Sequence, residues 1–116
     1  MGTQELIHYE PLEREFMGRG YSQRGWKFRE VKREGLIAMY EKVSEEGDEY
    51  WEVIRVLRDK GGIRVIGGVK VDFKAKERYP SDNEFGVSGW CFSSYERAEG
   101  RFMELVGVGE PSNSVI

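Results

Sequence analysis

The segment from Phe16 to Arg33 has the residue types most suited to binding chemistry. Arginine, aromatic residues and glycine are interspersed there, and the candidate contact residues are Arg19, Tyr21, Arg24, Trp26 and Arg29. Arginines contact phosphate oxygens and aromatic rings stack on bases, so this composition suits a nucleic acid. The same residue types are favoured at protein interfaces. A structural interpretation also stands, in which Trp26 is part of the core and the arginines protect an edge strand from pairing.

Residues for catalysis or metal binding are sparse. His8 is the only histidine and Cys91 the only cysteine. His8 precedes a proline in a segment without periodicity, and one histidine with one distant cysteine makes neither a zinc site nor a nucleophile–base pair. Cys91 stands between two aromatic residues and is expected to be a small buried side chain. We expect a non-enzymatic protein without a metal or cofactor.

Three further clusters indicate turns or loops more than ligand sites. The acidic run Glu45–Glu49 lacks the alternating ligands of a calcium loop and is expected to be a solvated hairpin tip. Gly18–Gly20 lacks the third glycine of a dinucleotide-binding loop. Asp59–Gly62 is expected to be a tight hairpin turn.

The composition predicts a single domain without a membrane segment. The chain has 116 residues, with 18 basic and 21 acidic residues and a formal net charge of −3. This balance argues against a protein that coats nucleic acid, and one cysteine requires no oxidising compartment. No apolar run is long enough to span a membrane. We therefore expect a cytoplasmic protein.

The elements that position these residues follow from periodicity. Apolar residues at every second position predict four consecutive antiparallel strands, and a change to helical spacing predicts a C-terminal helix. The expected strands are 26–33, 36–43, 49–58 and 63–73, followed by a short strand at 85–92 and a helix at 94–106. The predicted fold is α+β, an antiparallel meander sheet of four or five strands with the helix packed on one face.

Details of this sheet carry further expectations. The inward positions of the strand at 63–73 are Val65, Val69, Val71 and Phe73, and the pair Gly67–Gly68 indicates a bulge or sharp bend in it. The strand at 49–58 is apolar on both faces. The face without the helix would therefore need a cover, which favours a protein partner or a homodimer.

The helix has its own signals. Ser93 and Glu96 fit a capping box, and Gly107 fits the position after the last turn. The stripe facing the sheet consists of Tyr95, Ala98, Phe102, Leu105 and Val106. Trp90 is expected to pack beneath this stripe. The predicted organisation is an irregular extension at 1–15, one domain at 16–107 and a flexible tail at 108–116.

Several short motifs occur in a familiar order. They are Lys32–Glu41, Tyr50–Arg55, Tyr79–Ser81, Phe85–Gly86, Trp90 and Glu96–Glu99. In these motifs the chain, over about residues 16–106, resembles a group of small uncharacterised proteins encoded by bacteriophages and integrated mobile elements. The resemblance implies an accessory protein that binds a host or phage protein in the host cytoplasm. The alternative is a small nucleic-acid-binding module that uses the segment 16–33.

Overall fold

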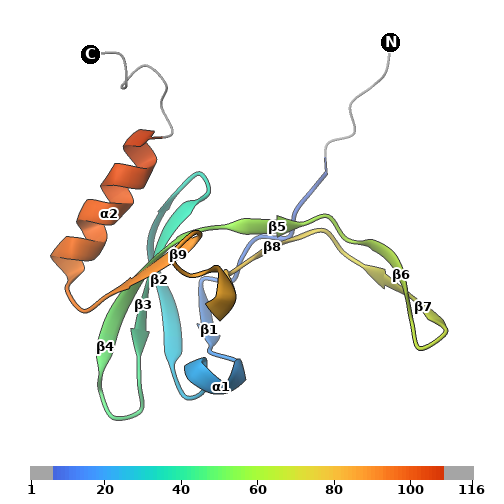
Figure 1. The fold of residues 1–116 in the computed structure, drawn as a ribbon, viewed down its shortest axis with the longest axis horizontal. Helices are drawn as coiled ribbons and strands as arrows, with labels where there is room; N and C mark the ends of the chain where they lie inside the picture. The colour runs from blue at the N-terminus through green and yellow to red at the C-terminus, as the bar shows by residue number, and fades with distance from the viewer. Residues whose placement is uncertain (1–6, 109–116) are drawn as a thin grey trace.

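The computed structural model describes residues 7–108 and has the predicted α+β architecture. A five-stranded antiparallel sheet in the order β1-β2-β3-β4-β9 carries the helix α2 on one face (Figure 1). The sheet strands are β1 (Glu15–Met17), β2 (Lys27–Glu34), β3 (Ile37–Val43), β4 (Glu49–Arg55) and β9 (Gly89–Phe92). The helices are α1 (Gly20–Gln23), α2 (Tyr95–Val108) and the 3₁₀ turn η1 (Asp82–Glu84).

A bulge in β2 decides which faces its last residues occupy. The register of β2 against β3 shifts between Glu30 and Lys32, so Val31 is an extra residue in the strand. Because side chains alternate between faces, the insertion reverses the alternation beyond it. Lys32 therefore lies on the α2 face, where its ammonium contacts Glu99, and Arg33 lies on the opposite face.

Both faces of the sheet are buried by the chain itself. The α2 face contains a core cluster of Ile37, Met39, Val53, Ala98, Phe102 and Leu105, with Trp51, Trp90, Phe92 and Val106 packed against it. The position of Trp90 and the stripe residues Ala98, Phe102, Leu105 and Val106 are thus confirmed. Tyr95, also predicted for the stripe, is 37% exposed and contacts Trp51 edge-on. The opposite face contains Phe28, Ala38, Tyr40, Ile54 and Val56, covered by Leu12, Phe16, Trp26, Tyr79 and Phe85. The prediction that this second face is uncovered is wrong, because the N-terminal segment and the 79–85 segment cover it.

The largest departure from the expected fold is a long two-stranded arm, residues 57–78. The chain leaves the sheet after β4 and runs out through β5 (Leu57–Asp59) and β6 (Gly62–Ile66). It returns through β7 (Val69–Phe73) and β8 (Lys76–Arg78), and the arm projects from the side of the sheet in Figure 1. The Cα radius of gyration is 16.9 Å, compared with about 13 Å for a compact domain of this length.

Glycines explain where the prediction failed in this region. Gly67 and Gly68 have φ of 57° and 80° and form the two-residue turn between β6 and β7, so the segment 63–73 is a hairpin and not one strand. Asp59–Gly62, expected as the hairpin turn, instead joins β5 to β6. Val65 and Val69, expected to point inward, are 66% and 62% exposed because nothing in the described chain packs on the hairpin.

The ends of α2 also differ slightly from the prediction. Ser94, and not Ser93, precedes the first turn, and its hydroxyl accepts a 3.4 Å hydrogen bond from the Arg97 backbone N–H. The helix continues through Gly107 to Val108. Gly107 is not among the glycines with positive φ, so it does not adopt the left-handed conformation that ends a helix.

Gly61 is the position in the arm where a side chain has no room. A Cβ there would lie 2.4 Å from the Phe73 carbonyl oxygen and 2.6 Å from the Ala75 nitrogen, and its φ of 76° disfavours other residues. We expect Gly61→Ala to destabilise the protein by roughly 1–3 kcal/mol, because both the backbone conformation and the contact are strained. Urea denaturation monitored by tryptophan fluorescence measures the change.

Gly100→Ala is the matched control. Gly100 lies in α2, its φ is not positive, and a Cβ there meets no atom within 4 Å. We expect this substitution to stabilise the protein by about 0.5–1 kcal/mol, since alanine has the higher helix propensity. If Gly61→Ala proved as harmless as Gly100→Ala, the backbone between β5 and β6 would not have this conformation.

Candidate functional site

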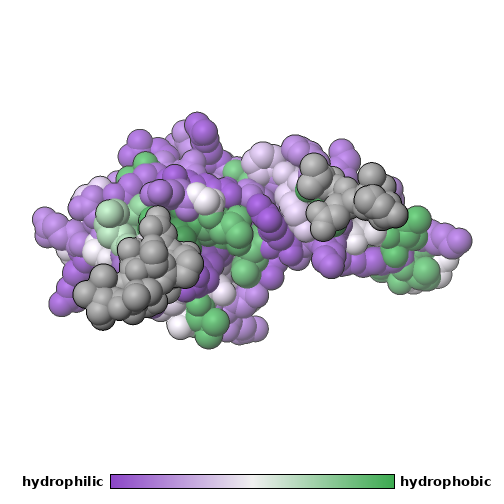
Figure 2. Space-filling model, turned by 90° about the horizontal axis from the view of Figure 1, so that it is seen from above, coloured by the Kyte–Doolittle hydropathy of each residue, from purple (hydrophilic) through white to green (hydrophobic). Residues whose placement is uncertain are grey.

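The outer half of the arm exposes large aliphatic side chains. Ile63, Val65, Ile66 and Val69 are between 55% and 70% exposed. Figure 2 shows hydrophobic side chains gathered near the end of the arm. An isolated two-stranded hairpin is only marginally stable in water, and exposed apolar groups of this kind commonly mark an interaction site. The tip of the arm is therefore the first candidate surface.

The same arm has a marked excess of positive charge. Beyond β5, five exposed cationic residues of the arm make no ion pair within residues 7–108, namely Lys60, Arg64, Lys70, Lys74 and Lys76. The exposed carboxylate among them is Asp72. The Arg64 guanidinium lies 4.8 Å from the centre of the Phe73 ring, which holds this cation against the hairpin. The arm thus combines exposed aliphatic side chains with an excess of positive charge.

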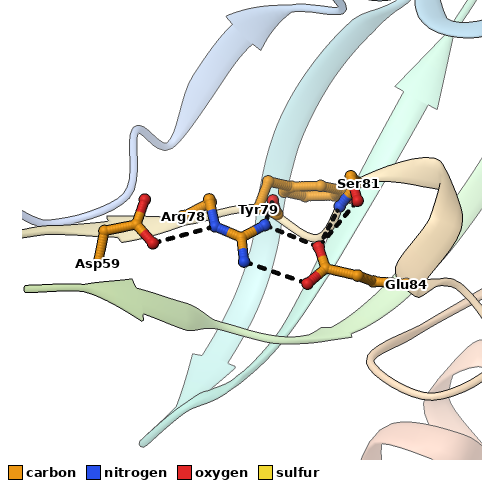
Figure 3. A network of polar contacts seen from close by, with 5 residues as sticks. All are labelled: Asp59, Arg78, Tyr79, Ser81 and Glu84. Carbon is orange, nitrogen blue, oxygen red and sulfur yellow. Dashed lines mark hydrogen bonds and ion pairs between the residues drawn. The ribbon is translucent and has the colours of Figure 1, made fainter. Parts of the chain in front are cut away.

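Ion pairs fix the root of the arm, which is the paired strands β5 and β8, to the rest of the protein. Arg78, at the end of β8, binds both carboxylate oxygens of Glu84 at 2.7 and 3.1 Å and contacts Asp59 at 3.4 Å (Figure 3). Glu84 also accepts hydrogen bonds from the Ser81 backbone and hydroxyl. Arg78 above all lowers the pKa of Glu84 from 4.5 to about 2. The spacing of Ser81 and Glu84 is that of a capping box, a local signal from which the 3₁₀ turn could have been predicted.

A second ion pair, with an added hydrogen bond, joins the arm to β2 and to the N-terminal segment. Arg33 binds the two carboxylate oxygens of Glu77 at 2.7 and 2.6 Å, and the Leu12 backbone N–H donates to the same carboxylate. The bond from Arg33 is the main reason that the pKa of Glu77 falls from 4.5 to about 2. Bidentate arginine–carboxylate pairs have a fixed geometry, so this pair orients the base of the arm.

A buried charged network of Lys42, Glu52 and Tyr79 lies next to the root of the arm. The Lys42 ammonium lies 2.8 Å from Glu52, and the Tyr79 hydroxyl donates a 2.7 Å hydrogen bond to the other oxygen of the same carboxylate. The side chains of Lys42 and Glu52 are 10% and 3% exposed. Burial, and then the charge of Glu52, raise the pKa of Tyr79. Lys42 also bonds to Gln23 and lies 5.0 Å from the centre of the Trp26 ring.

A cleft of about 600 Å³ opens beside this network, between the N-terminal segment and residues 76–85. Phe16, Phe28 and Tyr79 contribute apolar lining, and the buried Glu52 also lines the cleft. The Phe16 ring stacks on Phe28 with ring centres 4.8 Å apart and meets the Tyr79 ring edge-on. These three rings are therefore packed against one another. Because Glu52 is bound by Lys42 and Tyr79, its carboxylate is not free to act on a ligand in the cleft.

Cys91 is exposed, contrary to the prediction that it is buried. Alternation in β9 turns Trp90 and Phe92 toward α2 and leaves Cys91 on the other face, opposite Glu52 in the register. Partial burial of the thiol, followed by the charge of Glu52, raises its pKa, so the reactive thiolate is disfavoured. Within residues 7–108 no three His, Cys, Asp or Glu side chains come together in a way that could hold a metal ion.

The five residues predicted as a binding surface do not share one face. Arg19 and Arg24 flank α1 and are exposed. Tyr21 belongs to α1, and its side chain lies outside the described residues. Trp26 packs against Tyr50, with ring centres 5.7 Å apart. Arg29 is opposite Glu41 and bonds to it at 3.0 Å, on the α2 face, whereas Trp26 packs against the cluster on the other face.

The predicted organisation extends beyond what the structure describes. Residues 109–116 of the expected tail and residues 1–6 of the expected extension lie outside the described residues. Within the described part, the backbone of Glu10 forms an isolated parallel β-bridge with that of Lys76. Leu12 packs on the second core cluster. The end of the N-terminal segment therefore forms part of the wall of the cleft.

Comparison of the chain with protein-family models, with curated proteins and with solved structures finds no match. Among the helices in the described part of the chain, none has the length and apolar character needed to cross a membrane.

The buried network gives a direct test of the root. We expect Glu52→Gln to destabilise the protein by about 3–5 kcal/mol, because Lys42 would remain buried without a counter-charge. The substitution Glu46→Gln, at the exposed hairpin tip, should change stability by less than about 0.5 kcal/mol. Equilibrium denaturation of both variants provides the comparison, and equal stabilities would contradict the importance of the network.

The Arg33–Glu77 pair predicts acid sensitivity. Because the pKa of Glu77 is lower in the folded state, its contribution to stability is complete above pH 4.5 and is lost as the pH falls toward 2. We expect the wild-type protein to lose roughly 2–3 kcal/mol more than Glu77→Gln over this range. Urea unfolding at a series of pH values tests this, and parallel curves for the two proteins would refute it.

Proposed function

We propose that this chain is a non-enzymatic binding protein whose contact element is the arm and whose partner is another protein. The observation that carries the proposal is the exposure of four aliphatic side chains, Ile63, Val65, Ile66 and Val69, on a projecting hairpin. Removing such side chains from water stabilises a complex by about 25 cal/mol per Å² of apolar surface before the costs of association. The arm offers this surface without first having to unfold.

The charges around the tip favour a partner of a particular kind. Arg64 and Lys70 lie among the aliphatic residues of the hairpin and Lys60 and Lys74 lie at its base, and protein interfaces likewise combine an apolar centre with polar residues. Cations at a rim accelerate association with an acidic surface and select against basic ones. We infer a partner with an apolar groove bordered by carboxylates.

A nucleic acid is the competing ligand, since the cations of the arm would also suit phosphates. The tip argues against it, because binding to single strands relies on aromatic rings that stack on bases. The outer hairpin from Gly62 to Val71 contains aliphatic side chains and no aromatic residue. Phe73 is half-buried and lies near the Arg64 guanidinium. A protein groove is the better complement to this surface.

The resemblance to small proteins of bacteriophages and mobile elements suggests where such a partner would be found. In that setting the partner would be a host or phage protein in the host cytoplasm. The arm supports this kind of role because it presents a binding surface outside the main core. A protein of this kind would act by occupying a site on its partner, without turnover of a substrate.

Site-specific photo-crosslinking tests the proposal. We expect a photoreactive phenylalanine analogue at Val65 to crosslink one protein in cells that naturally express this chain. The same analogue at Val87, which is 75% exposed but lies outside the arm, should not. Mass spectrometry identifies the product. The purified partner should then bind the double variant Val65→Ser, Ile66→Ser at least about tenfold more weakly than wild type in calorimetry, since two apolar contacts are lost.

The control variant Val87→Ser should bind as wild type does. If Val65 and Val87 crosslinked the same mixture of proteins, the arm would not be the contact element. A crosslink from Val65 to DNA or RNA, together with a salt-dependent mobility shift lost in Lys70→Ala, Lys74→Ala, would replace the protein partner by a nucleic acid.

A further inference from the structure

We propose that the arm binds its partner by strand addition, in which an extended acidic segment of the partner pairs with the open edge of β6. The inference rests on the proposed protein-binding function and specifies the partner's chemistry. An added strand forms backbone hydrogen bonds along the edge, and its alternate side chains provide the specificity. The observations that carry it are the open edge, the position of Arg64 and the charge of the arm.

The outer edge of β6 has no neighbour in the described part of the chain. The small sheet contains β6 and β7 alone, with Ile66 opposite Val69 next to the turn. In a hairpin with a two-residue turn, the pair that closes the turn is hydrogen-bonded, and the bonding alternates from there. Arg64 and Ile66 therefore direct their backbone groups toward β7, whereas Ile63 and Val65 direct theirs outward.

The edge of β6 is less protected than the edge of β7. Proteins guard exposed edges with charged side chains. Strand β7 contains two charged residues, Lys70 and Asp72, and β6 contains Arg64 alone. Among the other sheet edges, β1 and β5 are three residues long and β9 is four, compared with five residues in β6. Strand β6 is accordingly the edge best suited to accept a further strand.

Alternation specifies the sequence that fits this edge. Arg64 lies on one face of the hairpin, and Ile63 and Val65 lie on the other. A strand beside β6 would place one side chain next to Arg64 and its two neighbours next to Ile63 and Val65. The matching pattern is apolar–acidic–apolar. The contact with Phe73 holds the Arg64 guanidinium in place, and this cation makes no ion pair within residues 7–108.

A second copy of the chain is a poorer occupant of the edge. Two β6 strands paired antiparallel about Arg64 would place Arg64 of one copy next to Arg64 of the other. Like charges at neighbouring positions of a sheet are unfavourable. The charge of the arm therefore favours a different chain with carboxylates at alternate positions.

A peptide probe tests strand addition directly. The probe is a fluorescein-labelled seven-residue peptide in which valine and glutamate alternate, titrated with the full-length protein and followed by anisotropy. We expect saturable binding that falls at least about tenfold when alternate backbone nitrogens of the peptide are methylated. Methylation removes the backbone donors while keeping all side chains, so this comparison needs no protein variant.

Charge exchange provides the second arm of the experiment. Arg64→Glu should lose binding of the valine–glutamate peptide and gain binding of a valine–lysine peptide. The control Lys27→Glu, at an exposed position of β2, should change neither. Amide exchange at Ile63 and Val65 should slow in the complex with wild type.

Three results would overturn the inference. They are equal binding of the methylated peptide, no binding of either peptide, or a protein dimer whose β6 amides are already protected. The crosslink from Val65 to a partner would still stand in those cases, so failure of strand addition is distinguishable from failure of the proposed function.

Discussion

The buried carboxylate of Glu52 is the interaction on which this structure most depends. A charge in an apolar setting must be paired, because the cost of removing it from water is several kcal/mol. Lys42 from the neighbouring strand supplies the counter-charge and Tyr79 supplies a hydrogen bond. Tyr79 directly follows β8, so the requirement to satisfy Glu52 also determines where the returning strand of the arm meets the sheet. Edge-on contacts of the Tyr79 ring with Phe16, Phe28 and Tyr40 then close the second core.

The root and the tip of the arm differ in their physical character. Near the sheet, Glu77 binds Arg33 and Glu84 binds Arg78, in two bidentate pairs that fix the direction of the arm. Beyond Gly61 the hairpin carries aliphatic residues without a cover. A rigid root lowers the conformational entropy that binding must overcome, and an uncovered tip retains the apolar surface that binding would bury. This division of roles is what makes the arm, and not the cleft, the best-supported contact element.

The buried polar network beside the cleft has a structural role. Lys42, Glu52 and Tyr79 are the residue types found in active sites, and they line or adjoin a cleft of about 600 Å³. Their atoms are nevertheless bound to one another, and the aromatic rings around them are packed together. The arrangement accounts for the position of α1 through Gln23 and for that of the 79–85 segment, because the polar atoms of these residues bind one another.

The sequence alone was sufficient for the α+β class, the hairpin of β2 and β3, the acidic tip before β4 and the apolar stripe of α2, because these depend on local periodicity and turn chemistry. It was insufficient for the arm, since the alternation of 63–73 is the same whether the segment pairs within the sheet or folds back at Gly67–Gly68. Nor could it reveal the ties between Arg33 and Glu77 or between Glu52 and Tyr79, which are 44 and 27 residues apart. Such long-range pairs have no local signal. Only the tertiary structure decided that the arginines and aromatic residues of 16–33 lie on two faces, and that the aliphatic side chains of the arm are exposed.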